Sequence, residues 1–303
     1  MKDLLKQLSF RAFRLASRVG FFVAPVHYYV PLANFHELKR TKPVWARRSD
    51  LPGVTSSLDK QASRLQEICI PFREEYTGNI TYHEAVNRHF GPGYGYIEAQ
   101  ALHGVVRHYK PLRVIEVGSG VSTLCMLRAL ELNEQETGQP FALTCIEPYP
   151  SNALRALDRI RLVESPVQTC SMEMFEELGS GDLLFIDSSH AVRPGGDVNY
   201  LILEVLPRLS PGVVIHFHDI YLPYDYPRDV LKTYFQWMET SLLRAYLIHN
   251  NRARILFCLS QLHYDRHEAL TEAFPEYVPA PDDNGLETTG RGHFPASIYI
   301  RTE

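Results

Sequence analysis

The chain has 303 residues, of which 45% are hydrophobic and 22% are charged, with 18 Gly and 20 Pro. This is the composition of a globular protein, and it excludes a disordered, collagen-like or low-complexity chain. With 31 basic and 35 acidic side chains the formal charge is −4. Such a chain has no overall basic excess to bind a phosphate backbone, so nucleic acid is not an expected partner.

Residues 1–22 have the pattern of a basic amphipathic helix. On a helical wheel, leucines and small apolar residues fall along one face, and Lys and Arg side chains fall on the other. A signal peptide would not interrupt its apolar region with Arg11, Arg14 and Arg18. We expect this helix to pack on its own domain or on a second subunit of a homo-oligomer. The alternative is contact with an anionic membrane surface.

The next segment, residues 23–60, is rich in Pro and aromatic residues, which indicates an ordered but irregular stretch that wraps over another part of the molecule. Helical spacing returns over residues 57–73, and residues 91–95 form a glycine-rich turn. We therefore assign residues 1–95 to a helical and irregular extension that serves as a lid or as an oligomerisation surface.

From residue 96 onward the chain alternates between helices and short apolar strands. The predicted strands are 114–117, 142–146, 167–170, 183–186, 213–217, 254–257 and 297–300. Apolar strands that alternate with helices are typical of a parallel sheet covered on both faces. The predicted fold of residues 96–303 is a three-layer α/β/α sandwich.

The five cysteines are dispersed, without Cys-x-x-Cys spacing, at Cys69, Cys125, Cys145, Cys170 and Cys258. An odd number of scattered thiols fits a reducing compartment better than a disulfide framework or a zinc knuckle. No stretch reaches the ~18 uninterrupted apolar residues of a membrane-spanning helix. These features predict a cytoplasmic protein.

The first predicted strand, 114–117, carries Glu116 and is followed by a glycine turn made of Gly118, Ser119 and Gly120. In parallel sheets, ligands bind at the carboxyl ends of the strands. Glycines let the backbone approach a ligand, and the start of the next helix offers free N–H groups. Thr123 stands where a dinucleotide fingerprint has its third glycine, and Glu116 would repel a pyrophosphate. A nicotinamide cofactor is therefore disfavoured.

Two further strands end in acids. Glu147 follows the second strand, at the position from which an acid hydrogen-bonds the ribose hydroxyls of an adenosine-bearing cofactor. Asp187 follows the fourth strand and is succeeded by Ser188, Ser189 and His190. The three features fall in order on three strands, and together they predict an adenosine-bearing cofactor at this edge of the sheet.

The stretches VIEVGSG, TCIEP, DLLFIDSSH and GVVIHFHDI resemble the class I S-adenosylmethionine-dependent methyltransferases, from about residue 96 to the C-terminus. The resemblance extends to bacterial sugar and natural-product O-methyltransferases. It implies a Rossmann-like fold with a mostly parallel seven-stranded sheet, in the strand order 3-2-1-4-5-7-6. It implies that S-adenosylmethionine is bound by Glu116, Gly118, Ser119, Gly120, Glu147, Ser171, Met172 and Asp187. Of these, Glu147 would hold the ribose, and Ser171 and Met172 would lie by the adenine.

The fourth and fifth strands suggest a metal. Asp187 and Asp219 would end adjacent strands, and two carboxylates so close repel each other unless a cation or a proton lies between them. Oxygen ligands favour Mg²⁺, and His218 would extend the choice to Mn²⁺, Fe²⁺ or Zn²⁺. We predict Asp187, His218 and Asp219 as metal ligands. His216, on the same face of the fifth strand, is equally well a core histidine bonded to a carboxylate.

Methyl transfer to an alcohol needs a group that accepts the hydroxyl proton, and a histidine with a pKa of ~6.5 is suited to this. His190 matches the position where metal-dependent O-methyltransferases of this fold place a Lys or His base. We therefore predict Asp187 and His190 as catalytic residues. Residues 221–227, rich in Tyr and Pro, form either an acceptor wall or ordinary loop packing.

The leading hypothesis is an S-adenosylmethionine-dependent methyltransferase that acts on a hydroxyl of a small-molecule acceptor, either a saccharide or a secondary metabolite. A divalent cation, Mg²⁺ or Mn²⁺, would assist the transfer. Two alternatives remain open. One is a metal-dependent hydroxylase-like enzyme on the same fold, and the other is a non-catalytic accessory protein that binds S-adenosylmethionine.

Overall fold

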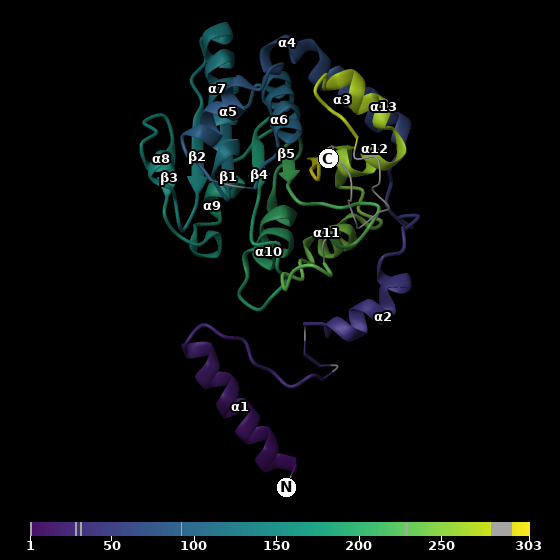
Figure 1. The fold of residues 1–303 in the computed structure, drawn as a ribbon. Helices are drawn as coiled ribbons and strands as arrows, with labels where there is room; N and C mark the ends of the chain where they lie inside the picture. Colours follow the sequence, from purple (N-terminus) through teal and green to yellow (C-terminus); the bar gives the residue numbers. More distant parts are fainter. Residues whose placement is uncertain (1, 28, 31, 92, 228–229, 280–292) are drawn as a thin grey trace.

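The computed structural model describes residues 2–27, 29–30, 32–91, 93–227, 230–279 and 293–303 (Figure 1). Its centre is a seven-stranded sheet in the order β3-β2-β1-β4-β5-β7-β6. The strands are β1 (Arg113–Val117), β2 (Ala142–Ile146), β3 (Arg161–Val163), β4 (Leu183–Ile186), β5 (Val214–Phe217), β6 (Ala253–Cys258) and β7 (Ile298–Thr302). The first five are parallel, and β7 is antiparallel to both β5 and β6. The predicted fold and strand order are confirmed.

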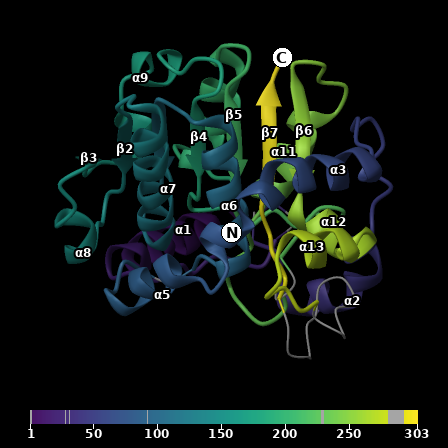
Figure 2. The same cartoon turned by 90° about the horizontal axis from the view of Figure 1, so that it is seen from above.

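Helices cover both faces of the sheet, and α7, α6 and α3 lie across one of them (Figure 2). The helices before β1 are α1 (Lys2–Arg18), α2 (Phe35–Trp45), α3 (Leu58–Cys69), η1 (Ile70–Phe72), α4 (Arg73–Tyr76), α5 (Ile80–Asn87) and α6 (Tyr96–Tyr109). Those between β1 and β5 are α7 (Val121–Thr137), α8 (Asn152–Arg155), η2 (Val167–Thr169), α9 (Glu173–Glu176), α10 (Asp197–Tyr200), η3 (Leu201–Val205) and η4 (Leu206–Arg208). After β5 come α11 (Glu239–Leu247), α12 (Leu259–Asp265) and α13 (His267–Ala273).

The three layers follow from the two-residue period of the strands. On β4, Leu183 and Phe185 belong to the core under α6 and α7, whereas Leu184 and Ile186 belong to the core on the opposite face. All four side chains are buried. A strand apolar on both faces requires cover on both, and this fixes β4 in the centre of the sandwich.

The predicted third strand over residues 167–170 is wrong. The strand lies earlier, at β3, and residues 167–169 form the 3₁₀ helix η2. Pro166 precedes η2, and its carbonyl accepts a hydrogen bond from the backbone N–H of Thr169. A proline supplies no ladder donor and favours a turn, so the chain leaves the sheet before this point. The helix between β2 and β3, α8, is short and ends at Arg155.

The N-terminal residues divide into two parts. Residues of α3, α4 and α5 contribute buried side chains to the core, among them Leu65, Ile68 and Tyr76. The core thus draws on chain that precedes the predicted boundary at residue 96. By contrast, α1 lies apart from the sheet (Figure 1). None of the helices in the described part of the chain has the length and apolar character to cross a membrane.

Candidate functional site

The parallel strands β4 and β5 end side by side, with Ile186 paired to Phe217. Asp187 follows β4, and His218 and Asp219 follow β5. Nδ1 of His218 lies 3.3 Å from Oδ1 of Asp187 and 3.6 Å from Oδ2 of Asp219. Each of the three residues offers a ligand atom, and these atoms lie within 4.8 Å of one another. The structure therefore brings together the three residues predicted as metal ligands, called the Asp-His-Asp cluster below.

His190 lies against the same cluster, and only 7% of it is exposed. Its Nε2 lies 3.4 Å from Oδ1 of Asp187 and 3.5 Å from Oδ2 of Asp219, while its Nδ1 lies 2.7 Å from Oε2 of Glu239. Its ring also contacts Trp237, with 4.6 Å between the ring centroids. The predicted catalytic residues Asp187 and His190 are thus neighbours in space.

The carboxylates decide the protonation of both histidines. Burial alone would lower the pKa of His190, but its hydrogen bonds to Asp187 and Glu239 raise that pKa to about 10. The pKa of His218, also opposed by burial, is held well above its usual range by Asp219 and Asp187. Conversely, the two histidines hold the pKa of Asp187 below its usual range, against the effect of burial. An imidazolium cannot accept a proton, so His190 can act as a base only when its carboxylate partners are otherwise engaged.

The carboxyl ends of β1 and β2 lie at the same edge of the sheet as those of β4 and β5. On β1, Glu116 is completely buried. Its carboxyl oxygens accept hydrogen bonds from the hydroxyls of Ser122 (2.7 Å) and Thr123 (2.6 Å) and from the thiol of Cys145 (3.3 Å). Burial raises the pKa of Glu116 to about 7, although the two hydroxyls act in the opposite sense. Its oxygens hold the start of α7. The predicted contact between Glu116 and the cofactor stays a prediction.

Gly118 shows why the turn after β1 requires glycine. Its φ is +80°, and a Cβ built on it would lie 1.8 Å from the carbonyl oxygen of Asp187. The backbone N–H of Gly118 donates to the carbonyl of Ile146 (3.0 Å), and the backbone N–H of Asp187 donates to that of Val117 (2.8 Å). A larger residue would separate the strand ends. Gly118 thus joins the glycine turn to the Asp-His-Asp cluster.

Glu147 lies directly after β2, next to this turn. One carboxyl oxygen accepts from the backbone N–H of Ser119 (3.3 Å) and the other from that of Tyr149 (2.8 Å). Gly120 completes the turn, and its backbone N–H donates to the Thr123 hydroxyl (3.0 Å). Residues predicted on separate strands therefore meet at a single edge.

Residues 115–220 match a family model described as a methyltransferase domain. They contain the glycine turn, Glu147 and the Asp-His-Asp cluster, and they belong to a sheet whose order and single reversed strand are those implied by the sequence resemblance. Residues 115–220 are therefore similar to a methyltransferase domain and are called the methyltransferase domain below.

The chain is also similar to known proteins. An uncharacterised protein of Archaeoglobus fulgidus is 27% identical over 192 residues, which span 59% of this chain and 83% of that protein. Among solved structures, the methyltransferase PaMTH1 of Podospora anserina is 13% identical with a TM-score of 0.39, covering 93% of this chain and 100% of that chain. The 1,6-didemethyltoxoflavin-N1-methyltransferase of Burkholderia thailandensis is 16% identical with a TM-score of 0.36, covering 92% and 94%. Both solved structures were determined with bound S-adenosylhomocysteine.

The two residues predicted beside the adenine are separated from the third strand by more residues than predicted, because β3 ends earlier. Ser171 and Met172 follow η2, eight and nine residues after β3 ends at Val163. Ser171 is exposed and donates to Glu173 (3.3 Å), and Met172 packs against the core. Their predicted contact with adenine stays a prediction.

His216 is a core residue. It is completely buried, its ring stacks on Phe185 with 4.1 Å between centroids, and its Nε2 lies 3.1 Å from the Ser297 hydroxyl. Burial holds its pKa well below the usual range. Of the two interpretations left open, the core one is therefore correct, although the hydrogen-bond partner is a hydroxyl group instead of a carboxylate.

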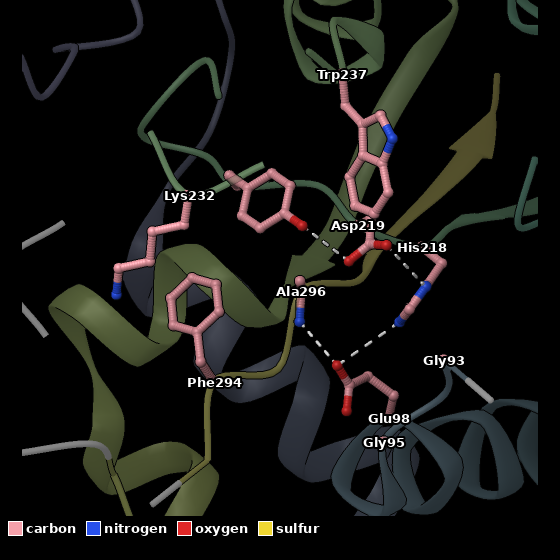
Figure 3. Close-up of a pocket in the computed structure, with 10 residues that line it drawn as sticks. Gly93, Gly95, Glu98, His218, Asp219, Lys232, Trp237, Phe294 and Ala296 are labelled. Atoms are coloured by element: carbon pink, nitrogen blue, oxygen red, sulfur yellow. Dashed lines mark hydrogen bonds and ion pairs between the residues drawn. The ribbon is translucent and has the colours of Figure 1, made fainter. Parts of the chain in front are cut away.

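A cavity of about 490 Å³ opens beside the cluster of the methyltransferase domain (Figure 3). Its lining combines polar groups with aromatic rings and consists of Gly93, Gly95, Glu98, His218, Asp219, Tyr221, Lys232, Trp237, Phe294 and Ala296. The Tyr221 hydroxyl donates to Oδ1 of Asp219 (2.9 Å). This contact supports the acceptor-wall interpretation for the start of segment 221–227.

Two buried acids of the site were not predicted. Glu98, in the first turn of α6, accepts from the backbone N–H of Ala296 (2.9 Å) and lies 3.8 Å from Nε2 of His218. Glu239, at the start of α11, accepts from the Ser188 hydroxyl (3.1 Å) besides contacting His190. Neither belongs to a strand end or a motif. The sequence offered one signal for them, an acid in the first turn of a helix. Such acids are common in all helices, so they do not indicate a site.

Proposed function

We propose that the protein transfers a methyl group from S-adenosylmethionine to a hydroxyl of a small acceptor, a saccharide or a secondary metabolite, with the help of a divalent cation. One observation carries this proposal. The Asp-His-Asp cluster lies between the glycine turn and the cavity, so that Asp187 touches the turn through Gly118 while His218 and Asp219 line the cavity.

The charge of the site supports cation binding. Four carboxyl groups, those of Asp187, Asp219, Glu98 and Glu239, face only two imidazoles. Even with both histidines protonated, the formal charge stays negative. Two carboxylates and one imidazole are ligands that Mg²⁺ and Mn²⁺ accept, and Asp187, His218 and Asp219 would be those ligands. A bound cation would supply Lewis-acid polarisation of the acceptor hydroxyl.

The cavity supports a small ring-shaped acceptor. Its volume of about 490 Å³ lies inside the range of ~300–1,000 Å³ usual for small-molecule sites. Tyr221, Trp237 and Phe294 supply flat apolar surfaces, on which sugar rings and aromatic aglycones both pack. The acids at its base favour hydroxyl groups over carboxylates, because a carboxylate would be repelled there.

The transfer is a displacement at the sulfonium methyl group. The acceptor oxygen forms a bond to the methyl carbon as the bond from carbon to sulfur breaks, and sulfur keeps the electron pair. The hydroxyl proton must leave, and His190, whose Nε2 lies 3.5 Å from Oδ2 of Asp219 in the cavity lining, is the proposed base. When Asp187 and Asp219 serve as ligands, His190 keeps only Glu239 as a partner, and Nε2 can take the proton. Glu239, bonded to Nδ1, orients the ring.

Titration calorimetry of the full chain with S-adenosylmethionine, with NAD⁺ as the comparison ligand, tests the cofactor assignment. We expect S-adenosylmethionine alone to bind, in the micromolar range. Glu147→Ala should raise its Kd by about 10–100-fold, because hydrogen bonds that involve a charged group contribute about 1.5–3 kcal/mol.

The matched control is Glu164→Ala. Glu164 follows β3 as Glu147 follows β2, but it is paired on the surface with Arg155, so its removal should leave the Kd unchanged. Absence of S-adenosylmethionine binding, both with and without Mg²⁺, would overturn the proposed function.

A further inference from the structure

Helix α1 and the turn after it expose a row of large apolar side chains. Leu8, Leu15 and Val19 follow helical spacing and are 52%, 67% and 68% exposed. Of the 21 large apolar side chains that are exposed among the described residues, 12 lie between residues 8 and 44. Elsewhere in the described chain such side chains are spread thinly over a much longer stretch, as is normal for a globular surface. The concentration at one end marks a contact surface.

The same end of the chain carries the opposite charge to the rest. Residues 1–48 contain 10 Lys and Arg but only 2 acidic residues, which leaves 21 basic against 33 acidic residues in positions 49–303. On α1 itself, Lys6, Arg11, Arg14 and Arg18 are exposed. By helical position, Arg11 and Arg18 border the row formed by Leu8, Leu15 and Val19, and Arg14 lies beyond them on the same side. Basic residues beside an apolar row are typical of helices that lie in a membrane interface.

The chain after α1 turns back along the other side of the helix. The ring of Phe22 meets that of Phe13 edge-on at 5.4 Å, and Phe10 stacks on Phe13 at 6.3 Å. The return contacts this face through Phe22 and Phe13, while Phe10 and Phe22 stay 59% and 56% exposed. The row of Leu8, Leu15 and Val19 also lies on the outside. The returning segment adds exposed apolar side chains, among them Val26 at 78%.

Residues 33–45 connect α1 and the returning segment to the chain beside the cavity. The backbone N–H of Ala33 donates to Oε1 of Gln236 (2.8 Å), and Nε2 of Gln236 donates to the carbonyl of Ala33 (2.9 Å). Trp45 meets Tyr226 edge-on at 6.2 Å. Gln236 precedes Trp237, which lines the cavity and contacts His190. Residues 2–26 therefore extend from the acceptor side of the domain.

We propose that residues 2–26 bind the protein to an anionic membrane surface. The apolar row enters the interface, and the Lys and Arg side chains bind the phosphates of acidic lipids. A second copy of the chain fits less well, because a symmetric contact between two α1 helices would bring like charges together. The proposal does not depend on the chemistry of the domain.

Flotation of the full chain with vesicles tests the proposal, with phosphatidylcholine alone compared against phosphatidylcholine mixed with phosphatidylglycerol. We expect binding to the mixed vesicles only, weakened by high salt. Arg14→Glu/Arg18→Glu should lower the partition coefficient at least about tenfold, because each basic residue near an anionic surface contributes roughly a factor of five. Leu15→Ser/Val19→Ser should lower it to a similar extent. The control Lys60→Glu/Arg161→Glu makes the same charge change at exposed positions outside residues 2–26 and should bind normally.

Three results would overturn the proposal: no binding to the mixed vesicles, equal loss in the control, or equal binding to both kinds of vesicle. A fourth result would show that a different partner covers the apolar row of α1. If the chain self-associates in sedimentation experiments, and Leu15→Ser/Val19→Ser dissociates it without any vesicle binding by the parent, α1 is covered by a second copy. Circular dichroism of each variant checks that the domain remains folded.

Discussion

Glu116 and Asp187 are acids at the ends of neighbouring strands, yet they have opposite surroundings. Glu116 lies within β1, opposite Phe185, and its carboxyl is fully buried among two hydroxyls and a thiol. Asp187 lies one residue beyond β4, its side chain is 24% exposed, and it faces two histidines. The pKa of Glu116 is raised to about 7, mainly by burial, whereas that of Asp187 is lowered by the histidines despite burial.

The difference shows how position along a strand decides what an acid can do. Inside the strand, a carboxyl group must be satisfied by the protein itself, and it becomes part of the scaffold. Beyond the last paired residue, it can face a cavity and keep its charge. Glu116 therefore supports the turn at which we propose that the cofactor binds, and Asp187 remains available for ligands.

The strongest challenge to this comparison is Asp187→Asn, which keeps the shape of the side chain and removes its charge. We expect Mn²⁺ affinity to fall at least about a hundredfold, because loss of even an outer-shell partner costs about 10–100-fold. The paramagnetic resonance signal of free Mn²⁺ measures this directly, without an acceptor. Asp158→Asn, on an exposed loop, is the matched control. Equal Mn²⁺ affinity in the parent and in Asp187→Asn would show that the cluster is no metal site.

Glu116→Ala addresses the scaffold side of the comparison. The hydroxyls of Ser122 and Thr123 would lose a buried partner, so the free energy of unfolding should fall by about 2 kcal/mol. Urea denaturation measures the change. Removal of the exposed Glu176 of α9 should alter stability by less than ~0.5 kcal/mol. If Glu116→Ala keeps full stability but loses S-adenosylmethionine binding, Glu116 contacts the cofactor and the comparison fails.

The smallest expected effect is on the pH dependence of stability. The folded-state pKa of His190 is about 10, against 6.5 without these partners. The stability that this histidine contributes is therefore fully present below pH ~6.5, and it declines as the pH rises toward about 10.

Between pH ~6.5 and ~8.5, below the range where thiols and phenols ionise, the metal-free protein should lose on the order of 1 kcal/mol of unfolding free energy per pH unit. Urea denaturation in the presence of a chelator measures this slope. His190→Gln should show a shallower one. The remaining slope belongs in part to His218, whose pKa is raised in the same direction. An unchanged slope in His190→Gln would mean that His190 is neutral in the folded protein.

Much of the fold was predictable because local sequence carried it. The central strands are short apolar runs, and an apolar run bounded by polar turns has few alternatives inside a sandwich. The exception was the third strand, because residues 167–170 look like a strand but Pro166 turns the chain away, and β3 lies earlier. The Asp-His-Asp cluster was predictable for a related reason. Its members directly follow adjacent parallel strands, whose carboxyl ends meet at one edge.

The amino-acid sequence by itself determined the sheet, the glycine turn and the acids at the strand ends, since each depends on residues close together in the chain. The tertiary structure alone decided that Glu98 and Glu239, from α6 and α11, surround the two histidines. It also decided that Glu116 is buried while Asp187 is partly exposed and faces His218. Protonation depends on charges and burial contributed by distant segments. No local pattern contains that information, because it exists only once the helices have packed against the strand ends.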